Sequence, residues 1–187
     1  TDPYLWMNAA EATFLRAEYE LRWGSAETAG TLYEQAVTLS FEERGADNVK
    51  GYLSDATSTP AAYKDPLNKH SMASPQSTIT VAWNAAADFV TNLERIITQK
   101  WIASTRCQAW DAWFDINRTG IPEVSEYTTD GDPDDYVLGT LAYNPNSSLA
   151  KGQFAHRFIY SKESLDYNTN APTKVPAITE PLWWHKK

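Results

Sequence analysis

Two consecutive helix-type repeats of apolar residues fill most of the first 44 residues and leave few folds open to this segment. Apolar side chains recur there at steps of three and four, the spacing of one α-helical face: Met7, Ala10, Phe14, Ala17 and Leu21, then Leu32, Ala36 and Leu39. Gly24 and Gly45 are expected to end the two helices. Ser25 or Thr28 is expected to cap the second one. Because only a few residues separate the helices, they must pack antiparallel as a hairpin.

Two more helices are predicted further along the chain. Residues 46–79 combine prolines, glycine and several Ser and Thr residues without periodicity, which predicts a long irregular loop. Within residues 80–120, apolar positions four apart predict a helix over Ala85–Ser104. Aromatic residues on one side predict a short helix over Cys107–Asn117, and the glycine and proline that follow are expected to stop it.

The last third of the chain, residues 121–187, is predicted to be a loop-rich segment that wraps around other parts of the fold. Prolines recur throughout it, and a short strand is predicted at Phe158–Tyr160. Long structureless loops are uncommon in a compact domain, so we expect this chain to belong to a larger body. The predicted fold class is all-α: a tetratricopeptide-like helix hairpin over residues 1–45, then further helices with long irregular loops.

Composition and charge exclude several classes of function. With 16 Lys and Arg against 24 Asp and Glu, the net charge of −8 argues against nucleic acid or an anionic membrane surface as a partner. A single cysteine, Cys107, and three histidines without metal-binding spacing predict neither an internal disulfide nor a zinc site. Phosphate-binding and serine-hydrolase motifs are missing from the sequence. No cofactor, no metal ligand and no catalytic residue is therefore predicted.

Two acidic patterns raise the question of chemistry. Asp111 and Asp115 lie four residues apart on one predicted helix, and a glycoside hydrolase needs two carboxylates. Catalytic pairs converge from different elements, whereas these two point in parallel, which favours a solvated or Arg-paired helix face. Asp130, Asp132 and Asp134 alternate as in a calcium loop, but the glycine and glutamate of an EF-hand are replaced. A solvated acidic loop is expected there, with a looser calcium site as the alternative.

Several stretches occur together in the order typical of one protein family. They are Met7–Glu18, similar to M-R-A-A-E-x-x-L-x-x-A-E; Ala29–Gly45; Ile96–Ala103, similar to I-x-x-Q-K-W-I-A; Ala109–Trp113 with Asn117–Pro122, similar to R-R-T-G-x-P; Arg157–Tyr160 with Glu163 and Asn168; and Leu182–Trp184. Asn117 in place of an arginine and Ser161 in place of a proline are small departures. Over nearly its whole length, the chain resembles the C-terminal part of the SusD/RagB family of outer-membrane nutrient-binding lipoproteins.

The resemblance implies that residues 1–187 are the C-terminal part of a SusD-like domain, which also needs the N-terminal part of the same protein. It implies a location on the extracellular face of the outer membrane, with a lipid anchor on that missing segment. There the protein would bind oligosaccharides or polysaccharides and deliver them to a SusC-like TonB-dependent transporter, without acting as an enzyme. The alternative is a tetratricopeptide-like module that binds a protein or peptide and no glycan.

The motif residues themselves are predicted to serve the fold rather than a ligand. Aromatic rings on apolar helix faces are expected in the core, namely Trp101, Trp110 and Trp113. Lys100 and Arg118 are expected to hold loops through carbonyl or carboxylate groups. Glu11 and Glu18 are their candidate partners. Trp183–Trp184 is expected to fasten the C-terminus onto the helices.

Ligand-binding residues are expected among aromatic side chains in loops. Loops place side chains at the surface rather than in the core. Sugar rings present apolar C–H faces, which stack on aromatic rings. The candidates are Tyr52, Tyr63, Trp83, Tyr127, Tyr136 and Tyr143.

Overall fold

The structure is a computed structural model that describes residues 6–61, 77–105, 108–122, 149 and 155–182. These residues form six α-helices and no strand, which confirms the all-α prediction. The helices are α1 (Ala9–Trp23), α2 (Ala26–Arg44), α3 (Val49–Leu53), α4 (Phe89–Ala103), α5 (Ala109–Thr119) and α6 (Lys162–Tyr167). None of the described helices is long and apolar enough to cross a membrane.

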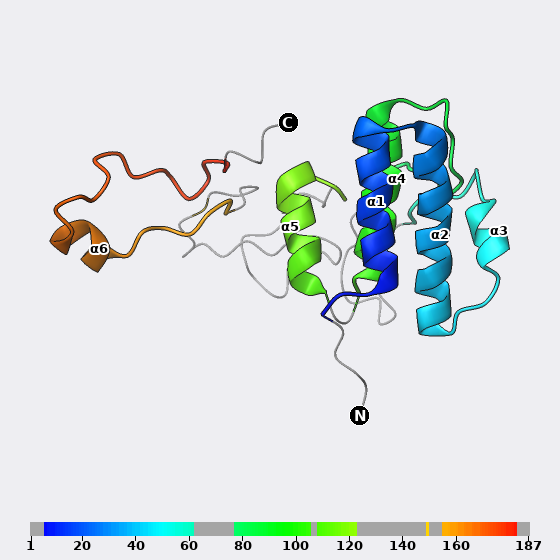
Figure 1. Cartoon of the computed structure of the whole chain (residues 1–187), viewed down its shortest axis with the longest axis horizontal. Helices are drawn as coiled ribbons and strands as arrows, with labels where there is room; N and C mark the ends of the chain where they lie inside the picture. The colour runs from blue at the N-terminus through cyan, green and yellow to red at the C-terminus, as the bar shows by residue number, and fades with distance from the viewer. Residues whose placement is uncertain (1–5, 62–76, 106–107, 123–148, 150–154, 183–187) are drawn as a thin grey trace, which may run out of the picture.

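The predicted hairpin is formed by α1 and α2, which run antiparallel (Figure 1). Both begin at a side-chain cap. Asn8 Oδ1 accepts a hydrogen bond from the Glu11 amide at 2.7 Å, and Ser25 Oγ accepts one from the Thr28 amide at 3.1 Å. Gly45 ends α2 in the left-handed conformation, with φ at 62°, where a Cβ would be strained. The hairpin and its boundaries are thus confirmed.

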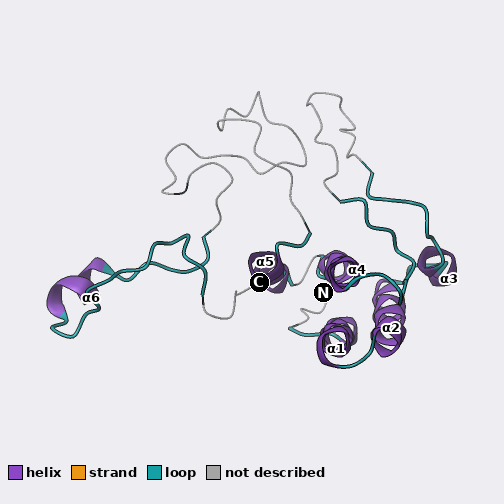
Figure 2. Ribbon diagram, turned by 90° about the horizontal axis from the view of Figure 1, so that it is seen from above, coloured by secondary structure: helices purple, strands orange, loops and turns teal. Residues whose placement is uncertain are grey.

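The hydrophobic core lies between α1, α2 and α4, which surround it in a triangular arrangement (Figures 1 and 2) and are called the helix layer below. α1 and α2 bury most of the apolar stripe expected from their spacing. On α4 only Leu93 and Ile97 of the expected stripe are buried, since Phe89 and Trp101 are exposed. The Phe14 ring meets the Tyr33 ring edge-on, with 6.5 Å between centroids, at the centre of this layer. The buried core residues are Ala10, Phe14 and Ala17 on α1; Leu32, Tyr33, Ala36 and Val37 on α2; and Leu93, Ile96, Ile97 and Ala103 on α4.

One short helix lies inside the segment predicted to be irregular. Helix α3 spans five residues, too few to reveal a periodic pattern in the sequence. Tyr52 on α3 packs its ring against Phe41 of α2, with 5.2 Å between centroids. The loop before α4 returns to α2, where Trp83 lies 5.3 Å from the Tyr33 ring. This loop also accepts a hydrogen bond from the Tyr33 hydroxyl. These contacts close the outer side of the core.

The two later helices form close to their predicted positions. α4 begins at Phe89 rather than at residue 85, because Asp88 Oδ1 accepts a hydrogen bond from the Thr91 amide at 2.9 Å and so caps it there. α5 is shifted by two residues toward the C-terminus, and Gly120 ends it with φ at 75°. Periodicity locates a helix, whereas the cap decides its first residue.

Residues 155–182 form an arm that extends from α5 away from the helix layer (Figure 1). The strand predicted at Phe158–Tyr160 is wrong: these residues form no strand. A strand requires a neighbour along its whole length, and the arm is joined backbone to backbone where the His156 amide donates to the Ile178 carbonyl. Helix α6, which had no periodic signal in its six residues, occupies the far end of the arm.

Candidate functional site

Helix α5 presents two chemically different faces. Ala112 and Asp115, which face the helix layer, are buried. The opposite face carries large aromatic rings, and Trp110 there is 70% exposed. The Trp110 and Phe114 rings lie one turn apart, with centroids 6.4 Å from each other and planes inclined by 30°. The expectation that the tryptophans of the motifs are core residues is therefore wrong for Trp110, and also for Trp101, which is 44% exposed.

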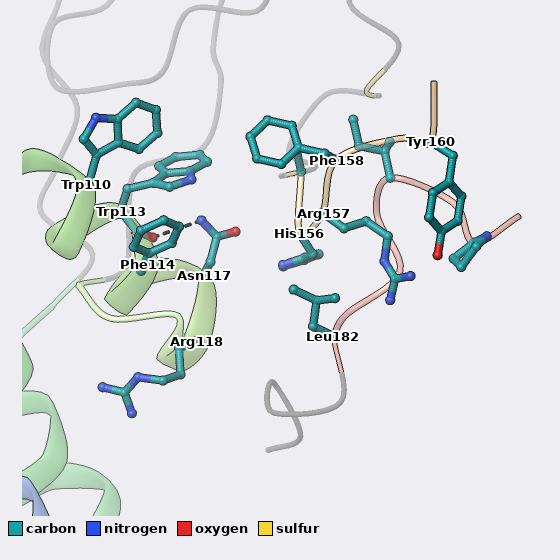
Figure 3. Close-up of a pocket in the computed structure, with 13 residues that line it drawn as sticks. Trp110, Trp113, Phe114, Asn117, Arg118, His156, Arg157, Phe158, Tyr160 and Leu182 are labelled. Carbon is teal, nitrogen blue, oxygen red and sulfur yellow. Dashed lines mark hydrogen bonds between the residues drawn. The ribbon is translucent and has the colours of Figure 1, made fainter. Parts of the chain in front are cut away.

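A pocket of about 850 Å³ lies between the aromatic face of α5 and the arm (Figure 3). Its volume falls in the range of roughly 300–1,000 Å³ that is usual for small-ligand sites. Five of its lining residues are aromatic. They are Trp110, Trp113, Phe114, Phe158 and Tyr160. Aliphatic side chains from the second half of the arm, Pro176, Ile178 and Leu182, complete the apolar lining.

The arm keeps its wall of the pocket in place through polar contacts along its own length. The Arg157 guanidinium donates from Nε to the Glu180 carbonyl at 2.9 Å and from Nη2 to the Pro181 carbonyl at 3.2 Å. Both halves of the arm are therefore held together next to the pocket. Phe158, on the same wall, is 96% exposed and is placed opposite the aromatic face of α5 (Figure 3).

The pocket offers few polar groups beside its rings. Asn117 lies on the α5 wall, and its Nδ2 donates to the Trp113 carbonyl at 2.9 Å. Arg118 also lines the pocket, but its side chain is directed away from the rings (Figure 3) and ends at Glu18 of α1 and Asp115 of α5. A mainly aromatic lining with a small number of polar groups is typical of sites that bind the apolar face of a ligand.

Behind α5, buried ion pairs connect it to α1 and α4. Lys100 Nζ lies 2.7 Å from Asp115 Oδ2 and 4.0 Å from Glu11 Oε1. Arg118 donates to both oxygens of Glu18, at 2.6 and 2.8 Å, and also reaches Asp115 Oδ1 at 2.8 Å. Lys100 and Arg118 were expected to hold loops through carbonyl or carboxylate groups, with Glu11 and Glu18 as candidate partners. Both bind carboxylates and both candidates take part, but the contacts join helices rather than loops. Asp115 also belongs to these ion pairs, since it binds Lys100 and Arg118. This agrees with the prediction of an Arg-paired helix face.

The two glutamates respond to this environment in opposite directions. Burial alone would raise the pKa of Glu18, but hydrogen bonds and charge from Arg118 and Arg22 outweigh it and lower this pKa below its ordinary value of 4.5. For Glu11, burial dominates over the charge of Lys100, and its pKa is raised above 4.5. Gln108, which starts the turn before α5, also donates a hydrogen bond to Glu11.

The ligand candidates chosen from the sequence fall into two groups. Tyr52 and Trp83 are described, and both are half-buried against the core. The Tyr52 hydroxyl donates to Gln99 Oε1 at 3.0 Å, and Trp83 Nε1 donates to the Ala26 carbonyl at 3.1 Å. Neither lies at the pocket. Their role in ligand binding stays a prediction. The other candidates, Tyr63, Tyr127, Tyr136 and Tyr143, lie outside the described residues.

Other expectations also concern residues that the structure does not describe. These are Cys107, the acidic run from Asp130 to Asp134, and Trp183–Trp184. Among the residues that are described, no group of three or more His, Cys, Asp or Glu side chains is arranged to hold a metal ion.

The aromatic pocket was missed because the sequence reveals only which residues share a helix face. Trp110, Trp113 and Phe114 recur at steps of three and four, and this pattern indicates a common face. It does not indicate whether that face meets the core or a loop. One signal in the sequence could have indicated the pocket. The α5 segment carries aromatic residues on one side and the acidic residues Asp111 and Asp115 on the other.

The fold and the pocket define a class of helical protein: a tetratricopeptide-like hairpin extended by helices and an aromatic arm. This chain belongs to the SusD-like family, described as SusD and RagB outer membrane lipoproteins, whose family model matches residues 1–178. No curated protein matches the sequence.

Solved structures of SusD homologues share this fold. One from Bacteroides uniformis is 36% identical, with a TM-score of 0.73, and is matched over 100% of this chain and 38% of its own. One from Bacteroides thetaiotaomicron is 33% identical, with a TM-score of 0.73, over 100% of this chain and 39% of its own. A chitin-binding SusD homologue from Flavobacterium johnsoniae is 32% identical, with a TM-score of 0.69, over 96% and 36% respectively. The chain thus spans less than two fifths of the length of these relatives.

Proposed function

We propose that this protein binds oligosaccharide or polysaccharide nutrients at the cell surface and delivers them to a SusC-like TonB-dependent outer-membrane transporter. The observation that carries the proposal is the aromatic pocket between α5 and the arm, in a chain of the SusD-like family. The chitin-binding homologue, 32% identical, supports a glycan as the ligand class. In this proposal the protein lies on the extracellular face of the outer membrane, held by a lipid anchor in the N-terminal part of the full-length protein.

The chemistry of the pocket suits a carbohydrate. Sugar rings carry apolar C–H faces that stack on aromatic rings, while their hydroxyl groups need only a few polar partners. Trp110 and Phe114 offer two ring faces one helical turn apart, and Phe158 offers a third from the arm. Such a site binds and releases a ligand without breaking a bond, as transfer to a transporter requires.

Native gel retardation tests the proposal directly. The full-length protein is run in gels that contain glycol chitin, arabinoxylan, galactomannan or laminarin. We expect retardation by at least one glycan and its loss in Trp110→Ala, since one stacked ring contributes about 1 kcal/mol or more and weak binding does not survive that loss. Trp23→Ala is the matched control, because Trp23 is also exposed, at 72%, but lies on α1 outside the pocket.

Each outcome has a definite meaning. Equal retardation of wild type and Trp110→Ala would place the glycan elsewhere and overturn the assignment of the pocket. No retardation by any glycan would overturn the proposed ligand class. Release of reducing ends during incubation would contradict a purely binding role.

A second candidate function is a protein- or peptide-binding module, and one observation favours it. On the outer face of α1, the exposed rings of Tyr19 and Trp23 lie with centroids 5.2 Å apart, next to the exposed Leu15. Aromatic pairs of this kind are enriched in protein interfaces. This function predicts protein capture that is lost in Trp23→Ala and unaffected by Trp110→Ala, the reverse of the glycan result.

A further inference from the structure

Helix α5 is attached to the helix layer mainly by charged groups. Among its described side chains, Ala112 is the buried apolar one and Asp115 is the buried polar one. Its aromatic side chains face the pocket instead, Ile116 is half-buried, and Ile121 just after the helix packs against the core. One buried alanine leaves little apolar area to hold an eleven-residue helix. With so little apolar area, the polar contacts between α5 and the helices behind it are a major part of this attachment.

Six charged residues from three helices provide these contacts, and we call them the ion-pair cluster. They are balanced, with three acidic and three basic members: Glu11, Glu18 and Arg22 on α1, Lys100 on α4, and Asp115 and Arg118 on α5. The side chains of Glu11, Glu18, Lys100 and Asp115 are each less than 10% exposed. Within this cluster every acidic group has a basic partner, which a buried charge requires.

The geometry of the ion-pair cluster defines both the position and the rotation of α5. Arg118 binds Glu18 through two parallel hydrogen bonds, at 2.6 and 2.8 Å, so its planar guanidinium accepts only one orientation. Lys100 binds Asp115 one turn earlier on α5, at 2.7 Å. Two contacts at successive turns of the same helix face, one of them bidentate, oppose rotation of α5 about its axis.

We propose that the ion-pair cluster, rather than apolar packing, sets the position of α5 and with it the aromatic wall of the pocket, which makes Lys100 and Arg118 positioning residues for ligand binding. The part that concerns the ligand rests on the proposed function. The part that concerns α5 does not. An apolar contact tolerates rotation and sliding, whereas a bidentate ion pair does not.

Hydrogen–deuterium exchange of the full-length protein tests the proposal without any ligand. In Arg118→Gln, Glu18 and Asp115 lose their shared partner while the fold of α1, α2 and α4 keeps its apolar core. We expect amides of α5 to exchange about 100-fold faster, because two buried carboxylates then lose a basic partner, which is destabilising. Amides of α2 should keep their wild-type rates. Lys162→Gln is the matched control, since Lys162 forms an exposed ion pair with Asp166 on α6.

Arg118→Lys separates geometry from charge. Lysine keeps the positive charge but has no planar fork, so we expect exchange in α5 between that of wild type and Arg118→Gln. In Glu18→Gln/Arg118→Gln neither member of the pair remains charged, and protection of α5 should recover in part. Loss of protection in α2 together with α5 would overturn the proposal, because Arg118 would then support the whole layer. Unchanged exchange in α5 would overturn it as well.

The consequence for binding has its own readout. If wild type is retarded by a glycan, Arg118→Gln should weaken that retardation about tenfold or more, although the Arg118 guanidinium is directed away from the rings. Full retardation with a loosened α5 would overturn the positioning role. If no glycan binds wild type, the proposed function fails, and hydrogen exchange alone decides whether the ion-pair cluster holds α5.

Discussion

Among individual residues, Glu18 is the clearest case of a buried charge that is stabilised by its neighbours. Arg22 Nε donates to its Oε1 at 2.8 Å, and Arg118 donates to both of its oxygens. Three charge-assisted hydrogen bonds replace the water that burial removes. The charge of Glu11 is less stabilised, because Lys100 Nζ is 4.0 Å from Glu11 Oε1 and lies closer to Asp115.

These two glutamates predict a two-part response of stability to pH. The pKa of Glu18 is lowered from 4.5, so its contribution is present above pH 4.5 and is lost as the pH falls through the lowered value. The pKa of Glu11 is raised, so its charged form costs free energy near neutrality, and this cost disappears as the pH falls through the raised value. We expect the free energy of unfolding to hold or rise slightly down to about pH 5 and to fall below about pH 4.

Urea unfolding of the full-length protein between pH 7 and pH 3 measures this profile. Glu18→Gln serves as the comparison, because glutamine does not titrate and should remove most of the decrease at low pH. A Glu18→Gln protein with the wild-type acid profile would contradict the assignment of that decrease to Glu18.

At the scale of helices and loops, close packing depends on one small residue in α2. Gly30 faces Trp83, and a Cβ built on Gly30 would overlap the indole ring. The same ring packs on Tyr33 and donates to the Ala26 carbonyl, so it is held on two sides. The glycine therefore lets the loop before α4 lie directly on α2.

Gly30→Ala should lower the free energy of unfolding by about 1–3 kcal/mol, because Trp83 must move out of a filled site. Alanine otherwise favours a helix interior by up to about 1 kcal/mol over glycine, so the sign of the change identifies the overlap. Gly51→Ala on α3 is the control: its Cβ would meet the flexible Asn48 side chain, which can turn aside. Chemical denaturation of both variants measures the difference. Stabilisation by Gly30→Ala would show that the loop is not closely packed.

For the molecule as a whole, much apolar surface is exposed along the arm and on α5. Phe158, Tyr167 and Trp110 are mostly exposed, and soluble monomers rarely leave such rings uncovered over a large area. The chain also spans only 38% and 39% of two of its solved relatives. The helix layer has a buried core and should be more stable than the exposed arm. The chain by itself is therefore not expected to unfold as one unit.

We therefore expect residues 1–187 in isolation to melt over a broad range and to bind an apolar dye such as ANS before melting. The helix layer should retain its circular dichroism after the arm and α5 have lost theirs, because it contains the buried apolar residues. Calorimetry and dye fluorescence on the same sample measure both. A sharp, reversible two-state transition would contradict this expectation.

Much of the helix layer could be predicted from residues that are neighbours in the sequence. Steps of three and four placed α1, α2 and α4, and Ser25 and Gly45 marked boundaries that the structure confirms. The motif residues Lys100 and Arg118 were expected to bind carbonyl or carboxylate groups, and the candidates Glu11 and Glu18 are among their partners, although Lys100 lies closer to Asp115. Short helices such as α3 and α6 were not predicted, since five or six residues carry no measurable period.

The local pattern was sufficient wherever a structure depends on residues a few positions apart, such as a helix, a cap or a shared face. It was not sufficient for α5, whose aromatic side was expected in the core. That side faces the arm, while on the other side Arg118 binds Glu18, 100 positions earlier, and Lys100 binds Asp115. Only the assembled fold brings these charges within hydrogen-bonding distance. In that fold Asp115 and Arg118 meet oppositely charged side chains of α4 and α1, and the rings of α5 face the arm.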